Sequence, residues 1–266
     1  MLDVEFAQLS DTGKVRDHNE DYLGYAAPAT PEQARSHGWL FALADGVGGH
    51  EKGEVASCAA VESLLADFRA TTVKETHEVL LTRLIQAVNT HVYQMGRTAS
   101  AGGVAMSTTL VACSLRYDRA AVAHVGDSRC YLVRHGEAMA LTRDHTVVND
   151  QVRLGLLSAR EAAGASTRHI LSRSIGNDLF VAVDTSDHQI FIGDVLVLCS
   201  DGLHGSVEKS EIAALTGNGG DLNKAAERLV ALANQRDGGD NISVQIIRVL
   251  AIERMGMYRG RPYKLR

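Results

Sequence analysis

The chain has 266 residues, 45% of them apolar, which is enough to bury a sizeable hydrophobic core. Its 27 Lys and Arg against 32 Asp and Glu give a net charge of −5, which argues against a nucleic-acid partner held by a broad basic surface. The four cysteines form no Cys-x-x-Cys pair, so zinc or redox motifs of that kind are excluded and a reducing compartment is favoured.

The division of the chain points to one domain. Only three prolines occur and no Gly/Ser-rich linker interrupts the sequence, so we expect one globular domain over residues 1–252. Residues 253–266 are rich in Arg and lack apolar periodicity, which predicts a mostly exposed basic tail. The sequence shows neither a signal peptide nor an apolar run of about 20 residues, so we expect a cytoplasmic monomer without a membrane span.

Runs of β-prone residues predict eight strands, and apolar residues at helical spacing predict five helices. The strands are expected at Val4–Leu9, Trp39–Ala44, Thr108–Arg116, Ala120–Val125, Cys130–Arg134, Phe180–Thr185, Val195–Cys199 and Ile242–Val249. The helices are expected at Val55–Phe68, Leu80–Met95, Val147–Leu157, Glu208–Leu215 and Leu222–Ala233. Because strands follow one another and are interrupted by pairs of helices, the class is α+β with antiparallel sheets.

Aspartates stand beside glycine at the ends of four β-prone runs. They occur in Asp45-Gly46, Gly126-Asp127, Asp201-Gly202 and Gly239-Asp240-Asn241. One such pair is only a turn signal, since Asp and Gly favour turns for local reasons. If these strand ends converge, however, the carboxylates repel one another and lose water, which is unfavourable unless cations lie between them. Hard divalent ions such as Mg²⁺ or Mn²⁺ suit an all-oxygen set of ligands.

A second acidic feature lies near the start of the chain, where Glu20 and Asp21 follow Arg16. Alone, this segment is an ordinary polar loop. Together with aspartates at strand ends, Arg16 becomes a candidate for binding a phosphate group at the metals, because a guanidinium matches phosphate oxygens with two donors.

Six segments, in this order, resemble the motif series of the metal-dependent type-2C Ser/Thr protein phosphatases in their bacterial form. They are Arg16…Asn19-Glu20-Asp21, Ala44 to His50, His124 to Arg129, Leu141 to His145, Ser200 to Gly202 and Gly239 to Asn241. The resemblance runs from about Asp3 to Val249, so residues 1–252 would form the phosphatase catalytic domain. It implies a four-layer α-β-β-α sandwich of two antiparallel sheets flanked by helix pairs.

The resemblance also implies a binuclear Mn²⁺ or Mg²⁺ site at one edge of the sandwich. In that picture Asp45 bridges the ions, Asp201 and Asp240 hold the first, and Glu20 or Asp21 with the Gly46 carbonyl serves the second. Asp45, Asp201 and Asp240 would be the catalytic residues, because a hydroxide that bridges the ions attacks the phosphorus of phosphoserine or phosphothreonine. The metals and Arg16 would stabilise the charge on the phosphoryl oxygens.

Other parts of the resemblance leave alternatives open. Asp127 could join Asp201 in holding a third ion, although a strand-end turn explains Asp127 equally well. The case for a third ion is weaker because Gly205, preceded by His204, stands where some members have another acid. Residues 144–168 correspond to the flap beside the site, or to plain packing. The implied partners are phosphorylated Ser/Thr proteins and a Ser/Thr kinase that the enzyme opposes.

Two further positions depart from the family pattern. Val47 stands where members outside the bacterial branch often have a histidine that acts as general acid, and His50 nearby is assigned no such role. Met106 replaces a small residue, which should affect packing more than metal binding. The histidines are too dispersed to suggest another metal cluster.

The sequence gives less support to other functions. Gly46 to Gly53 fails the spacing of phosphate-cradling loops, and no Gly-x-Ser-x-Gly elbow of a serine hydrolase occurs. A catalytically silent phosphatase-like module that binds a phosphoprotein remains the alternative. Such a module would be expected to lack a metal carboxylate, yet Asp45, Asp201 and Asp240 are all present. The enzyme is therefore the favoured reading.

Overall fold

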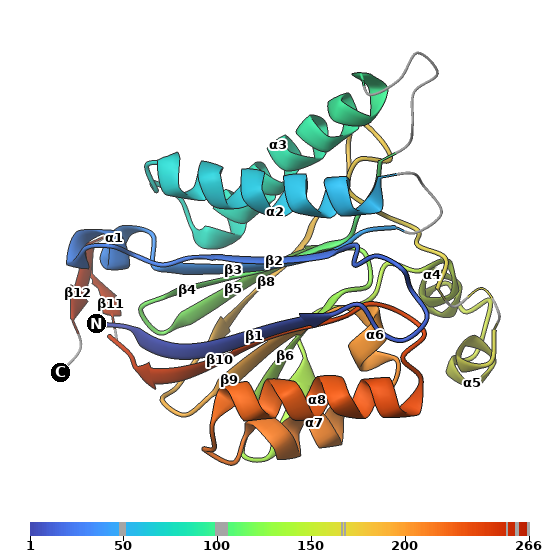
Figure 1. Ribbon diagram of the computed structural model, residues 1–266. Coiled ribbons are helices and arrows are strands. Elements are labelled where there is room, and N and C mark those ends of the chain that lie inside the picture. The colour runs from blue at the N-terminus through green and yellow to red at the C-terminus, as the bar shows by residue number, and fades with distance from the viewer. Residues whose placement is uncertain are drawn as a thin grey trace.

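Two antiparallel sheets lie face to face between two layers of helices (Figure 1). The computed structural model describes residues 1–47, 52–98, 106–165, 167, 169–253, 255–258 and 261–264. This arrangement confirms the predicted α+β class and the four-layer sandwich.

The first sheet has the strand order β2-β3-β4-β5-β8 and is covered by two long helices. Its strands are β2 (Asp21–Ala26), β3 (Trp39–Asp45), β4 (Leu110–Arg116), β5 (Arg119–Val125) and β8 (Asp184–Gln189), and its helices are α2 (Gly53–Ala70) and α3 (His77–Thr98). Along β3 the side chains alternate between two cores, as the pleat of a strand requires. Leu40 and Ala42 face α2 and α3, whereas Phe41 and Leu43 face the second sheet.

The second sheet has the order β1-β10-β9-β6-β7. Its strands are β1 (Asp3–Asp11), β10 (Ile242–Ala251), β9 (Val195–Cys199), β6 (Arg129–Arg134) and β7 (Glu137–Ala140), with α7 (Lys209–Thr216) and α8 (Leu222–Arg236) outside. Leu196, Leu198 and Ile247 from this sheet meet Phe41 and Leu43 in the central core. Both sheets are therefore apolar on two faces, which explains their continuous hydrophobic runs.

Several predicted elements differ from the structure. The strand expected at Phe180–Thr185 begins later, as β8, and the helix expected at Val147–Leu157 ends earlier, as α4 (Val147–Arg153), before a second short helix α5 (Ala159–Ala163). The prediction missed five elements within the domain: β2, β7, α1 (Pro31–Ser36), α5 and α6 (Asp201–His204).

Both termini lie at the end of the molecule that carries α1 (Figure 1). Glu253 is buried there, within 3.8 Å of the Met1 amino group and 3.8 Å of Arg35 Nε. In the segment predicted as a basic tail, β11 (Met255–Tyr258) and β12 (Arg261–Lys264) pair as an antiparallel hairpin.

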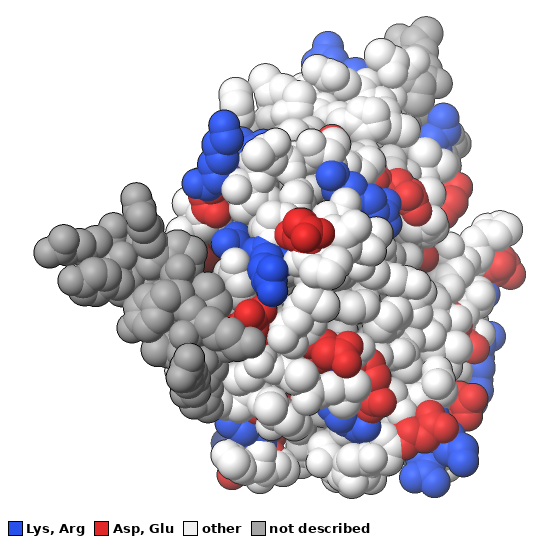
Figure 2. Space-filling model, turned by 90° about the vertical axis from the view of Figure 1, so that its left-hand side faces the viewer, with Lys and Arg blue, Asp and Glu red and all other residues white. Residues whose placement is uncertain are grey.

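On the face of the molecule shown in Figure 2, acidic and basic side chains of the described residues are intermixed rather than separated into broad patches. Among the helices that the structure describes, we find none with the length and apolar character needed to span a bilayer.

Candidate metal centre

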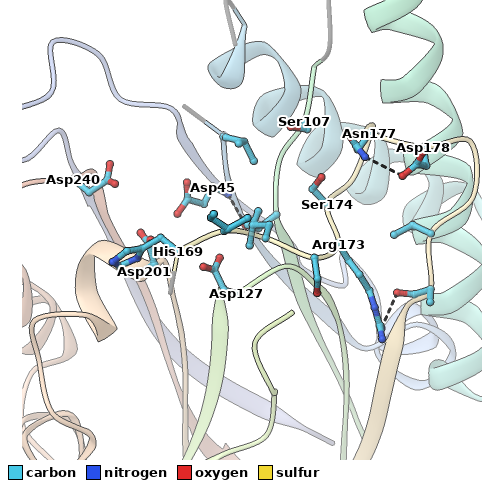
Figure 3. A pocket seen from close by; sticks show the side chains of 18 of the residues that line it. Asp45, Ser107, Asp127, His169, Arg173, Ser174, Asn177, Asp178, Asp201 and Asp240 are labelled. Carbon is cyan, nitrogen blue, oxygen red and sulfur yellow. Dashed lines mark hydrogen bonds and ion pairs between the residues drawn. The ribbon is translucent and has the colours of Figure 1, made fainter. Parts of the chain in front are cut away.

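A cavity of about 890 Å³ opens at the end of the sandwich opposite the termini. Most of the residues singled out from the sequence line it: Arg16, Asp45, Gly46, Asp127, Asp201 and Asp240. Figure 3 shows the four aspartates gathered on one side of this cavity. The structure thus brings together side chains that are far apart in the sequence, as expected if the strand ends converge.

The convergence follows from the topology of the two sheets. Asp45 is the last residue of β3 in the first sheet, and Asp127 lies in the turn that joins β5 to β6 of the second sheet. Asp201 begins α6 directly after β9, and Asp240 precedes β10. Because β9 and β10 are neighbours in the second sheet, the site lies where the ends of both sheets meet.

The backbone of Asp45 is held by two threonines that directly precede β4, Thr108 and Thr109. Its N–H donates to Thr109 Oγ1 at 3.0 Å, and its carbonyl accepts from Thr108 Oγ1 at 2.7 Å and from the Thr109 N–H at 2.8 Å. These bonds fix the point where β3 ends. The direction in which the Asp45 carboxylate leaves the strand is therefore set by the sheet rather than by a free loop.

Gly46 is required by its surroundings. A Cβ at Gly46 would lie 2.5 Å from the backbone of Gly53 at the start of α2 and 2.8 Å from the Glu20 carbonyl. The Gly46 N–H donates to that same Glu20 carbonyl at 3.0 Å. Only glycine allows α2, β2 and the end of β3 to approach so closely, which places the Gly46 backbone at the cavity wall.

Asp21 is the direct cross-strand partner of Asp45 in the pairing of β2 with β3. Its side chain is buried, and neither carboxylate oxygen has a hydrogen-bond partner. Burial raises the pKa of Asp21 to about 7. Asp21 and Glu20 are not among the described residues that line the cavity, so they stand beside the four cavity-lining aspartates rather than among them.

The electrostatics of the group favour bound cations. Burial, together with the carboxylates of Asp21, Asp201 and Asp127, raises the pKa of Asp45 well above its usual value. Burial also raises the pKa of Asp127 to about 7. Burial opposes ionisation of Asp201 as well, but its contacts with His169 and with the charge of His204 hold the pKa of Asp201 below its usual value.

These carboxylates cannot all be ionised near neutral pH unless positive charge is added between them. All the donors are hard oxygens, which is the chemistry that Mg²⁺ and Mn²⁺ prefer. The unpartnered buried oxygens of Asp21 and the raised pKa values therefore fit a site for divalent ions.

Arg16 lies at the rim, where its Nη2 donates to Asp240 Oδ2 at 2.9 Å. The loop that carries it is organised by Asn241, whose role the sequence analysis missed. Asn241 Oδ1 accepts from the Glu20 N–H at 2.8 Å, and its Nδ2 donates to the carbonyls of Thr12 and His18, each at 2.9 Å. The only sequence signal was its place in the Gly-Asp-Asn motif.

Two histidines near the aspartates were also missed. His169 Nδ1 lies 3.8 Å from Asp201 Oδ2, and Figure 3 shows the two side chains together at the cavity. His204 is directed toward the turn of Asp127, where its Nε2 donates to the Asp127 carbonyl at 3.0 Å. His50 lies outside the described residues.

A second cluster lies nearby, contrary to the expectation that the histidines are dispersed. His124, His145 and Asp184 place one potential metal-ligand atom each within 4.8 Å of one another, and the two imidazole rings stack with centroids 4.6 Å apart. Arg173 Nη1, however, lies 2.8 Å from Asp184 Oδ1 and 3.3 Å from His145 Nε2. The guanidinium already supplies the positive charge that a metal would bring.

Comparison with known proteins identifies the family of this chain. The family model of protein phosphatase 2C matches residues 15–237. The serine/threonine phosphatase stp of Listeria innocua is 34% identical over 256 residues, covering 95% of this chain and 96% of that protein. Protein phosphatase PhpP of Streptococcus pneumoniae is 33% identical over 247 residues, covering 92% of this chain and 97% of that protein.

Solved structures show the same architecture. The Streptococcus agalactiae serine/threonine phosphatase superposes with a TM-score of 0.83 at 35% identity, covering 92% of this chain and 99% of that one. The catalytic domain of the serine/threonine protein phosphatase PstP, solved with two manganese ions, gives a TM-score of 0.79 at 30% identity and covers 94% and 100%. The chain therefore belongs to the protein phosphatase 2C family in its bacterial form. This confirms the family and the enzyme class, protein-serine/threonine phosphatase, expected from the motifs.

Proposed function

We propose that this enzyme hydrolyses phosphoserine and phosphothreonine in proteins by means of two Mn²⁺ or Mg²⁺ ions, and that it opposes a Ser/Thr kinase. The observation that carries the proposal is the group of buried carboxylates with raised pKa values at the end of the sandwich, beside an arginine. The two manganese ions in the related PstP structure support the number of ions.

The proposed ligands follow from the positions of the side chains. Asp45 would bridge the ions because it stands among the other carboxylates, with Asp201 and Asp240 on the first ion. The Gly46 carbonyl with Glu20 or Asp21 would serve the second. When bound, the ions lower the pKa of a shared water and stabilise charge on the phosphoryl oxygens.

The residues of the chain orient the substrate. Arg16 is nearly half exposed, and its Nη2 forms an ion pair with Asp240. Its remaining N–H groups can therefore donate to a phosphate at the cavity mouth. A planar guanidinium that binds two phosphoryl oxygens fixes the phosphorus relative to the metals. Arg16 would thus both position the substrate and balance its charge.

A third ion could lie between Asp127 and Asp201. Burial and the charges of Asp201 and Asp144 raise the pKa of Asp127, and Arg129 offsets this only in part. This raised pKa supports such a site. The substrates would be phosphoproteins of the same compartment as the kinase, and we propose a cytoplasmic monomer.

Phosphate release from phosphoserine and phosphothreonine peptides tests the proposal. We expect release with Mn²⁺ or Mg²⁺, none with EDTA, and a loss of at least about 100-fold in kcat for Asp45→Asn. Asp67→Asn, on the exposed side of α2, is the matched control and should retain full activity. Binding of Mn²⁺ and phosphopeptide without any release would instead support the catalytically silent module.

A further inference from the structure

The cavity extends well beyond the aspartates. Its volume of about 890 Å³ is near the upper end of the range of about 300–1,000 Å³ that is usual for ligand pockets, so it has room for more than a phosphate group. Figure 3 shows Arg173, Ser174, Asn177 and Asp178 on the side away from the metal ligands. The segment from Arg173 to Ala182 therefore forms a second wall, opposite the carboxylates.

This second wall carries exposed apolar side chains. Phe180 is 81% exposed, and it lines the cavity together with its neighbours Val181 and Ala182. A single exposed apolar residue needs no explanation, but three consecutive apolar residues in the wall of a reaction site offer a surface that a partner could cover. An exposed phenyl ring supplies a large contact area at low entropic cost.

The wall is held in place by α3. Asn89 is fully buried, its Nδ2 donates to the carbonyls of Asp178 at 2.9 Å and Leu179 at 3.1 Å, and its Oδ1 accepts from the Gly176 N–H at 2.8 Å. Gln86 Nε2 also donates to the Val181 carbonyl. Phe180 is thus presented from a backbone that is tied to a helix on both sides.

We propose that Phe180, with Val181 and Ala182 beside it, forms a subsite for a large apolar side chain next to the phosphorylated Ser or Thr of the substrate protein. The proposal rests on the proposed function, because the subsite shares one cavity with the metal ligands. Asp178 on the same wall adds a carboxylate, and together with the aspartate group it disfavours acidic residues at this position.

Two matched phosphoserine peptides test the subsite, one flanked by Phe on both sides and one flanked by Ala. We expect wild-type kcat/KM to be about 10-fold higher for the Phe-flanked peptide, which is the size of effect that an apolar pocket gives. Phe180→Ala should bring this ratio close to unity, whereas Phe180→Leu should retain most of it.

Ile192→Ala is the matched control, since Ile192 is 64% exposed but lies outside the cavity lining, and it should keep the wild-type ratio. Phe180 is so exposed that its loss should not impair folding. Equal hydrolysis of the two peptides by the wild type, or an unchanged ratio in Phe180→Ala, would overturn the subsite while leaving the phosphatase intact. Hydrolysis of neither peptide with Mn²⁺ would overturn the proposed function and the subsite together.

Discussion

Asp45 combines two properties that conflict in the metal-free protein. Its carboxyl group is buried among other carboxylates, which raises its pKa, yet it must be ionised to bind a cation. The metal-free protein therefore keeps a proton at this site to a higher pH than the unfolded chain does. The stability of the fold and the loading of the site are coupled through this one group.

We expect Asp45→Asn to stabilise the metal-free protein relative to wild type, increasingly so as the pH rises above about 4, the usual pKa of an aspartate. The pKa of Asp45 is higher in the folded than in the unfolded chain, so wild type loses stability as the pH rises toward the folded pKa. Asn has no proton to lose. Urea unfolding in EDTA should show a difference in the free energy of unfolding that grows as the pH rises above that value.

Buried histidines respond in the opposite direction and must be separated from this effect. Burial lowers the pKa of His77 to about 4, so its contribution to stability is lost as the pH falls below about 6.5. His77 is common to both variants, so the difference between them isolates Asp45. A difference that does not change with pH would contradict the prediction.

The sequence predicted those site residues that have a recognisable pattern in their immediate neighbours. Asp45, Asp127, Asp201 and Asp240 each stand at a strand end next to glycine, and the structure gathers all four. Asn241 could not be found in this way, because its three hydrogen bonds reach a loop more than 200 residues earlier in the chain.

At the scale of elements, the sequence did not predict strand β2 because it contains a glycine that is needed for packing. Gly24 weakens the β signal of this short strand. A Cβ there would lie 2.6 Å from Leu65 and 2.8 Å from Val61, so glycine lets α2 approach the sheet. The same close approach brings Asp21 next to Asp45, which means that the missed strand is part of the site.

The displaced strand β8 has a different cause. It is an edge strand of polar residues whose exposure alternates, and an exposed edge needs no apolar run. The apolar residues just before it, including Phe180 and Val181, instead line the cavity or pack toward α3. Hydrophobicity alone cannot distinguish a strand from the wall of a site.

The loop before β2 yields a further prediction. Asn241→Ala would leave the Glu20 N–H and two carbonyls without their partner, which costs about 1–3 kcal/mol for each buried group that stays unpaired. Because this loop carries Arg16, we expect KM for phosphopeptide to rise about 10-fold or more, since misplacement of a positioning group is costly.

Steady-state kinetics and thermal unfolding of Asn241→Ala measure the two effects. Asn223→Ala, at an exposed position in α8, is the control and should change neither. If Asn241→Ala lowered stability but left KM unchanged, the loop would not depend on Asn241 for the placement of Arg16.

At the scale of the whole molecule, metal binding should stabilise the fold. The proposed metal ligands come from the edges of both sheets, and ions that bind only the folded state shift the unfolding equilibrium by mass action. We expect a gain of about 2.7 kcal/mol when free Mn²⁺ is 100 times its dissociation constant. Thermal unfolding over a series of Mn²⁺ concentrations measures it.

Asp67→Asn should show the same gain with Mn²⁺ as wild type, and Asp45→Asn a much smaller one. A melting temperature that does not depend on Mn²⁺ in the wild type would contradict the proposed ligands.

The place of the site between the two sheets has one more consequence. Asp45 ends β3 of the first sheet, whereas Asp201 follows β9 and Asp240 precedes β10 of the second, so the offset between the sheets sets the distance between the two groups of proposed ligands. That offset is fixed in the central core, where Phe41 meets Ile247 far from the solvent. The packing of the central core thus sets the spacing of the proposed metal ligands. The affinity for metal therefore depends on how well the two sheets are aligned.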